Sequence, residues 1–148
     1  MQKWIAFLLS GALALAFVVG LFIQPLDSEA NSTSYWHAEF FENVELAGDP
    51  IYTRSDRGIN FNWAAEAPAP GVPADSFSVR WSGVFDFEAR TYEFSVGADE
   101  GVRFWIDDEL LIDRWMTSND DYAVLTETVE LSRGSHDLRL EYFDASGL

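Results

Sequence analysis

Apolar and polar residues alternate strictly in short runs between Phe77 and Trp115, and acidic or glycine-containing turns separate the runs. Phe77, Val79 and Trp81 alternate with serine and arginine, and the same pattern returns at residues 92–96. A side-chain period of two is typical of half-buried β-strands, and no helical period competes with it. The segment therefore predicts antiparallel strands joined by tight turns, and it constrains the fold more than the chemistry.

Two tight turns flank the apolar-polar run at residues 102–106. Asp99, Glu100 and Gly101 precede this run, and the segment 107–109 (Asp-Asp-Glu) follows it. In such turns a short acidic side chain bonds nearby backbone groups and glycine takes the left-handed conformation at little cost. We expect both turns to close β-hairpins.

Other segments extend the pattern toward both ends of the chain. Residues 37–41 indicate a first strand, residues 59–63 alternate again, and residues 138–142 form one more clear run. Residues 65–73 hold three prolines and one glycine, which excludes a paired central strand. We expect a surface crossover loop there.

The N-terminal segment is apolar over the twenty residues Trp4–Ile23, which carry no charge and follow Lys3. This length is close to the roughly 20 residues that span a bilayer and exceeds the usual signal-peptide core of about 7 to 15. It favours an N-terminal hydrophobic helix that stays as a membrane anchor. The small residues of Ser28-Glu29-Ala30 keep a cleaved signal peptide as the alternative. In both cases the positive-inside rule leaves the following domain outside the cytoplasm, exported and either membrane-anchored or secreted.

Composition narrows the classes of protein and partner. We expect residues 1–30 to serve targeting and tethering, and residues 36–148 to form one domain. Twenty-five acidic against nine basic side chains give a net charge of −16, which repels phosphate backbones, so nucleic acid is not an expected partner. The chain has no cysteine, and its stability must therefore come from an aromatic-rich core rather than disulfides.

Several motifs occur in a fixed order along the chain: WHAEFFENVELAGDP, INFNW, VPADSFSVRWSG, YEFSVGADEGVRFWIDDELLIDRW and LSRGSHDLRLEYFDASG. Together they resemble the anthrax protective-antigen-type (PA-fourteen) domain family. The resemblance implies an all-β antiparallel β-sandwich and a carbohydrate-binding, lectin-like role on secreted or surface proteins. Members of that family continue past the position of Gly147 into a closing strand, which is missing here. We therefore expect the neighbour of that strand to have unpaired backbone groups.

The turn at Asp99 and Glu100 is the candidate ligand and metal site that the resemblance implies. The resembled family commonly carries Asp-Asp-Gly at this place, and in one branch the paired aspartates hold a calcium ion that bridges sugar hydroxyls. Asp99 matches this motif and Glu100 departs from it. Because calcium takes six to eight oxygen ligands, Asp120 and Asp121 are candidates to complete the shell. The alternative is ordinary hairpin chemistry, which needs no ligand.

Tryptophan side chains near strand ends are candidates for contact with a sugar face. Trp105 is out of phase with Phe104 and Ile106, so it faces away from the core if those two side chains face inward. Trp115 precedes the loop that carries the second acidic cluster. Trp105 and Trp115 therefore join the acidic turn as candidate glycan-binding residues.

Enzymatic activity is not expected. The sequence contains no cysteine nucleophile, no G-x-S-x-G elbow, no H-E-x-x-H motif and no glycine-rich phosphate loop. His37 and His136 are the two histidines, and both are expected to be solvent-facing or hydrogen-bonded strand residues. The sequence indicates an extracellular glycan-binding module, with a structural spacer or protein-interaction domain as the alternative.

Overall fold

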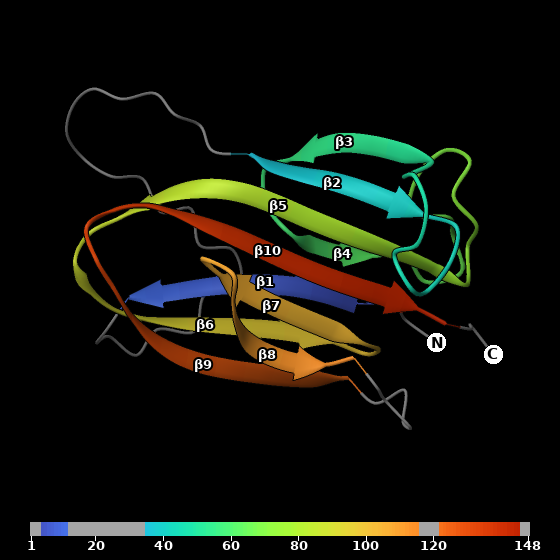
Figure 1. Cartoon of the computed structure of the whole chain (residues 1–148). Coiled ribbons are helices and arrows are strands. Elements are labelled where there is room, and N and C mark those ends of the chain that lie inside the picture. Colours follow the sequence, from blue (N-terminus) through green and yellow to red (C-terminus); the bar gives the residue numbers. More distant parts are fainter. Residues whose placement is uncertain (1–3, 12–34, 116–121, 146–148) are drawn as a thin grey trace.

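The computed structural model describes residues 4–11, 35–115 and 122–145, and these residues contain β-strands and no helix. The strands form a four-stranded and a six-stranded sheet that face each other as two layers (Figure 1). All strand pairs are antiparallel. The predicted antiparallel β-sandwich is confirmed.

The larger sheet contains six of the ten described strands. Its order is β3-β2-β5-β10-β7-β8. The strands are β2 (Trp36–Phe41), β3 (Tyr52–Asp56), β5 (Phe77–Phe87), β7 (Val102–Ile106), β8 (Glu109–Arg114) and β10 (Gly134–Asp144).

The four-stranded sheet has the order β4-β1-β6-β9. Its strands are β1 (Trp4–Gly11), β4 (Asn60–Asn62), β6 (Arg90–Ala98) and β9 (Ala123–Leu131). The chain passes from one sheet to the other repeatedly, so each sheet contains strands from both halves of the domain (Figure 1).

Strand β1 corrects the prediction of an N-terminal hydrophobic helix. Trp4–Gly11 pairs with β4 on one side and with β6 on the other. Ile5 is completely buried, and an uninterrupted apolar run fits a buried strand as well as a helix. The helix prediction is therefore wrong for residues 4–11, while residues 12–23 of the same run lie outside the described residues. Within the described ranges no helix is long and apolar enough to cross a membrane.

The interior strands are paired on both sides. Strand β6 lies between β1 and β9, and β10 lies between β5 and β7. The missing closing strand stays a prediction.

The core between the sheets is built from aromatic rings. Phe7 of β1 lies 5.5 Å from Trp36, 5.9 Å from Phe94 and 5.0 Å from Phe104, measured between ring centroids. A second group stacks Phe61, Trp63 and Trp81 in nearly parallel planes. Such pairs add to the free energy of area burial, and they join strands of both layers.

The structure confirms one of the two predicted hairpin turns. The turn at Asp99, Glu100 and Gly101 leads from β6 in the four-stranded sheet to β7 in the six-stranded sheet, so it closes no hairpin. Residues 65–73 form no strand, as predicted, although Ala69 and Val72 are buried against the core. Asp107 and Asp108 have φ angles of 49° and 66°, the left-handed pair that a two-residue hairpin turn requires. This turn joins β7 to β8.

Candidate functional site

The acidic turn between β6 and β7 is buried beneath the protein surface. Asp99 and Glu100 are each only 7% exposed. Oδ1 of Asp99 accepts a hydrogen bond from the Tyr142 hydroxyl at 3.0 Å, and Oε2 of Glu100 accepts one from the backbone N–H of Ala145 at 2.5 Å. Both carboxylates thus tie the turn to the end of β10.

The electrostatic surroundings keep the Tyr142 hydroxyl protonated. Burial raises the pKa of this phenol far above its usual range, and the nearby carboxylates of Asp99, Asp144 and Glu100 raise it further. A phenol that does not ionise remains a hydrogen-bond donor at every physiological pH. Tyr142 is therefore a permanent donor to the acidic turn.

Gly101 has a different role from the one expected. Its φ angle is not among the positive values in the chain, so the left-handed conformation does not explain the residue. A Cβ at this position would lie 1.9 Å from Cε1 of Phe143, and the Gly101 carbonyl accepts a hydrogen bond from the Phe143 N–H. Glycine is required here because the Phe143 ring packs directly on the backbone.

The residues of the acidic turn do not make up a calcium shell in the described structure. Asp99 and Glu100 already accept internal hydrogen bonds, and calcium takes six to eight oxygen ligands. In residues 4–11, 35–115 and 122–145, no three histidine, aspartate or glutamate side chains gather where they could hold a metal ion. Asp120 and Asp121, the other predicted ligands, lie outside these ranges.

The outer face of the six-stranded sheet carries an ordered row of charges. Arg80 donates to Oε1 of Glu141 at 2.9 Å, and Arg103 donates to Oε2 at 2.6 Å. Arg80 also lies 3.8 Å from the carboxylate of Glu39. Glu141 is 3% exposed, and each of its oxygens binds one arginine. The row therefore links β2, β5, β10 and β7 across the sheet.

Trp105 and Trp115 lie on this outer face, as the alternation of Trp105 with Phe104 and Ile106 predicted. The guanidinium of Arg139 lies 4.2 Å from the Trp105 ring centroid, and that of Arg103 lies 3.9 Å from the Trp115 ring centroid. Arg103 is also 5.3 Å from Trp105. Both tryptophans are partly buried under arginines, so cation–π contacts hold their rings in place.

A hollow of about 480 Å³ opens beside Trp105 on this face. It crosses four neighbouring strands, because its walls come from β2, β5, β10 and β7. In the register of the sheet, one continuous row joins His37 to Ser82, Ser82 to Arg139, and Arg139 to Trp105. The lining residues whose side chains bear on the chemistry are Tyr35, His37, Ser82, Trp105, Asp108, Asp137 and Arg139.

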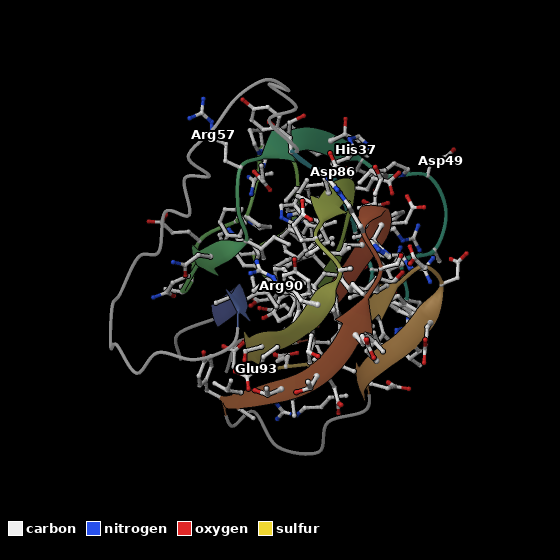
Figure 2. All side chains as sticks on the ribbon, turned by 90° about the vertical axis from the view of Figure 1, so that its left-hand side faces the viewer. His37, Asp49, Arg57, Asp86, Arg90 and Glu93 are labelled. Atoms are coloured by element: carbon white, nitrogen blue, oxygen red, sulfur yellow. The ribbon has the colours of Figure 1, made fainter. Side chains whose placement is uncertain are left out.

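Figure 2 shows which layer carries His37, one of the lining residues. His37, which lines the hollow, lies on the six-stranded layer, and Glu93 lies on the opposite layer. Arg90, on the strand that carries Glu93, lies 4.7 Å over the ring of Tyr92. The two layers therefore each carry an arginine that stacks on an aromatic ring, but only Arg139 does so within the hollow.

Arg139 stands out among the lining residues. Its guanidinium forms no ion pair with any carboxylate in the described part of the chain, and its buried Nε has no hydrogen-bond partner there. The carboxylates of Asp108 and Asp137 line the same hollow. The hollow thus presents hydrogen-bond donors, acceptors and aromatic surface together, which suits a ligand rich in hydroxyl groups.

The turn that carries Asp108 is fastened to β10 beside the hollow. Nδ1 of His136 lies 2.5 Å from Oδ2 of Asp107, and the backbone N–H of Asp137 donates to Oδ1 at 2.9 Å. Nε2 of His136 lies 3.0 Å from the Ser132 carbonyl. A protonated imidazole can donate to both of these oxygens at once, so the two contacts favour the protonated form of the ring. This raises the pKa of His136 and lowers that of Asp107.

Of the residues that line the hollow, the sequence predicts only Trp105 as a ligand-binding residue. Its phase predicts that it faces away from the core, and the same argument applies to His37, Ser82 and Arg139 on their own strands. Only the order of the strands in the sheet brings these residues together. That order joins strands far apart in the chain, and a single sequence carries no direct signal for it.

The chain is similar in sequence or in fold to several known proteins. The chain is 37% identical over 107 residues to the anti-sigma-I factor RsgI3 of Acetivibrio thermocellus, a match that covers 71% of this chain and 16% of that protein. It is 34% identical to a solved anti-sigma factor domain-containing protein from Clostridium clariflavum, with a TM-score of 0.66. That match covers 77% of this chain and 38% of the relative.

A further solved structure, also an anti-sigma factor domain-containing protein, is 31% identical, with a TM-score of 0.65 and coverage of 85% of this chain and 44% of that one. The chain thus spans less than half the length of each of these relatives. The family model described as the PA14 domain matches residues 31–148. The chain belongs to the PA14 domain family.

Proposed function

We propose that this chain is an extracellular, non-catalytic carbohydrate-binding module, and that it binds its ligand in the hollow on the outer face of the six-stranded sheet. One observation carries the proposal: the guanidinium of Arg139 has no ion-pair partner in the described residues, and it lines a hollow of about 480 Å³ together with Trp105 and two carboxylates. The guanidinium contacts the Trp105 ring, and no carboxylate of the described residues forms an ion pair with it.

The chemistry of the hollow fits sugar hydroxyls. A hydroxyl both donates and accepts, so it can accept from Arg139 and donate to Asp108 or Asp137. Aromatic rings supply the apolar contact that the carbon-hydrogen faces of a sugar ring need. Two carboxylates beside one guanidinium, on a chain of net charge −16, favour a neutral sugar over an acidic one.

The acidic turn has a supporting role in this proposal. Asp99 and Glu100 are buried and bonded to β10, so we place sugar recognition at Trp105 and assign the turn to the stability of the domain. Trp115 contributes through Arg103, which lies over its ring and also contacts Trp105. Calcium is not needed for binding in this arrangement.

The family and the relatives are compatible with a binding role outside the cell. The relatives at 31% to 37% identity are anti-sigma factor proteins by name, and signalling proteins need a domain that detects a signal. A module of this kind, held at the membrane or secreted, would detect polysaccharide on the outer side.

A polysaccharide and glycan array tests the proposal with the full chain and with Arg139→Ala. We expect binding to at least one neutral glycan, unchanged by a chelator, and a loss of at least about tenfold in Arg139→Ala. Arg90→Ala is the matched control, because it removes an arginine that stacks on an aromatic ring of the other sheet. It should bind like the parent chain.

Three results would overturn the proposal. A folded chain that binds no glycan in the array would leave a structural or protein-interaction role. Equal loss in Arg139→Ala and Arg90→Ala would show that the effect is general and not local to the hollow. Binding that a chelator abolishes would return recognition to a metal site.

A further inference from the structure

We infer that the hollow takes an internal stretch of a neutral polysaccharide, about three sugar units long, between two aromatic contacts, Tyr35 at one end and Trp105 at the other. This inference rests on the proposed function and deepens it, because it states the length and the chemical class of the ligand. It concerns the sheet face and is independent of the acidic turn.

The length follows from the register of the sheet. The row from His37 through Ser82 and Arg139 to Trp105 crosses three gaps between neighbouring strands. Neighbouring strands lie about 4.7 to 4.9 Å apart, so the row extends over roughly 14 Å. A pyranose unit is about as long as one strand spacing, so the row matches about three linked units.

Trp105 ends this row on β7, and Tyr35 lies two residues before His37, the member at the other end. Tyr35 directly precedes β2 and is 41% exposed, and Arg57 lies 5.8 Å from its ring centroid. Trp105 is at the other end, where Arg139 lies 4.2 Å from its ring. Both Tyr35 and Trp105 line the hollow. A single sugar can reach only one of these contacts, while a chain of several units can reach both.

The middle of the hollow supplies polar contacts. Ser82 and Arg139 lie side by side on β5 and β10, and Asp137 lies two residues before Arg139 on the same face of β10. Hydroxyl groups of a central sugar unit can bond with this set, while the aromatic contacts hold the units on either side. The chemistry therefore changes along the hollow in the order ring, polar group, ring.

The hollow is open to solvent along its length. Val84 is 55% exposed, and His37, Asp108 and Asp137 are exposed as well. An open trough on the face of a sheet accepts a chain that continues beyond both ends, whereas a closed pocket takes a chain end. We therefore assign internal units of a chain as the ligand.

Calorimetric titration of the full chain with β-1,4-linked gluco- and xylo-oligosaccharides of one to six units tests this inference, together with the series cut from any neutral polysaccharide that binds in the array. We expect at least about a tenfold gain in affinity from one to three units and little gain beyond four. Blocking the chain end chemically should leave the affinity unchanged.

Tyr35→Ala should remove most of the gain in affinity between one and three units. Tyr35→Phe keeps the ring and should keep the gain. Tyr122→Ala is the matched control, because Tyr122 is a 52% exposed tyrosine next to β9 in the other sheet. It should match the parent chain for every oligosaccharide.

The outcomes separate this inference from the proposed function. Equal affinity for one unit and for six, or a gain in affinity that Tyr35→Ala leaves intact, overturns the two-contact chain site while glycan binding stands. Preference for a free chain end or for acidic units overturns the assignment of internal, neutral units. Absence of binding to every glycan overturns the proposed function, and this inference with it.

Discussion

Tyr142 of β10 donates a 3.0 Å hydrogen bond to the carboxylate of Asp99 in the turn between β6 and β7. The hydroxyl comes from a completely buried side chain, and Asp99 is itself buried. The two residues are 43 positions apart in the chain, and their bond joins the acidic turn to the central strand of the six-stranded sheet. The turn is therefore part of the interior of the domain.

We expect Tyr142→Phe to destabilise the domain by about 1 to 3 kcal/mol, because a buried carboxylate loses a donor while the ring is kept. Urea unfolding followed by fluorescence measures the change. Tyr35→Phe removes a hydroxyl from an exposed ring and should change the free energy of unfolding by less than about 0.5 kcal/mol. Equal stability of Tyr142→Phe and the parent chain would contradict the assigned role.

Gly101→Ala should destabilise the domain by about 1 to 3 kcal/mol, because the new Cβ would meet the Phe143 ring at 1.9 Å and the neighbouring strands cannot move apart freely. The double variant Gly101→Ala with Phe143→Leu should recover part of this loss. Gly58→Ala is the matched control, since a Cβ at Gly58 meets nothing within 4 Å. Thermal unfolding of the three variants checks the expectation, and a fully stable Gly101→Ala chain would refute it.

Period-two alternation predicted the sandwich because it reports directly which face of each strand is buried. It succeeded within Phe77–Trp115, where Trp81, Phe94 and Phe104 of the alternating runs are completely buried. It could not decide between a helix and a strand for the uninterrupted apolar run at Trp4–Gly11, because a run without alternation fits both. Strand β9 was not predicted, because its residues do not alternate strictly between apolar and polar. Val124 and Leu125 are neighbouring apolar residues, Thr126 and Glu127 are neighbouring polar ones, and most residues of the strand are exposed.

The candidate site was less predictable than the fold. The position of Trp105 on the outer face followed from its phase, but the burial of Asp99 depends on Tyr142, which is far away in the chain. The hollow depends on the order of four strands that are not consecutive. Local patterns report which face a side chain occupies, whereas strand order decides which side chains share that face.

Ile5→Ala tests the assignment of residues 4–11 to a strand of the sandwich. Ile5 is completely buried, so its truncation should cost about 2 to 5 kcal/mol of unfolding free energy in the full chain. Val124→Ala, at a 58% exposed position of the same sheet, should cost much less. If Ile5→Ala unfolds like the parent chain in aqueous buffer, β1 does not contribute to the stability of the domain.

The stability that the row of charges on the outer face contributes should depend mainly on Glu141, its buried member. Glu141→Gln removes the charge that binds both Arg80 and Arg103, and we expect a loss of about 2 kcal/mol, moderated because solvent reaches both arginines. Glu39→Gln removes a carboxylate that lies 3.8 Å from Arg80, and it should cost less than about 1 kcal/mol. Equal costs for the two variants in urea unfolding would contradict a central role for Glu141.

The pair formed by His136 and Asp107 predicts a pH dependence with a definite sign. Hydrogen bonding to Asp107 raises the pKa of His136, so its contribution to stability is complete below the unfolded pKa of about 6.5 and is lost as pH rises through the higher folded value. Hydrogen bonding to His136 lowers the pKa of Asp107, so that contribution is complete above about pH 4 and is lost as pH falls through the lower folded value. The pair therefore stabilises the domain most between about pH 4 and 6.5.

We expect the difference in melting temperature between the parent chain and His136→Gln to be largest in that window and to shrink above neutral pH as the imidazole loses its proton. The gain should stay below about 1 kcal/mol, because the Asp107 side chain is half exposed and solvent screens the pair. His37→Gln removes an exposed histidine and serves as the control. The difference in melting temperature between His37→Gln and the parent chain should not follow the pH dependence expected for His136→Gln. Melting curves from pH 4 to 8 for the three chains decide the matter, since a difference for His136→Gln that is constant with pH would mean that the ring acts by packing and not by charge.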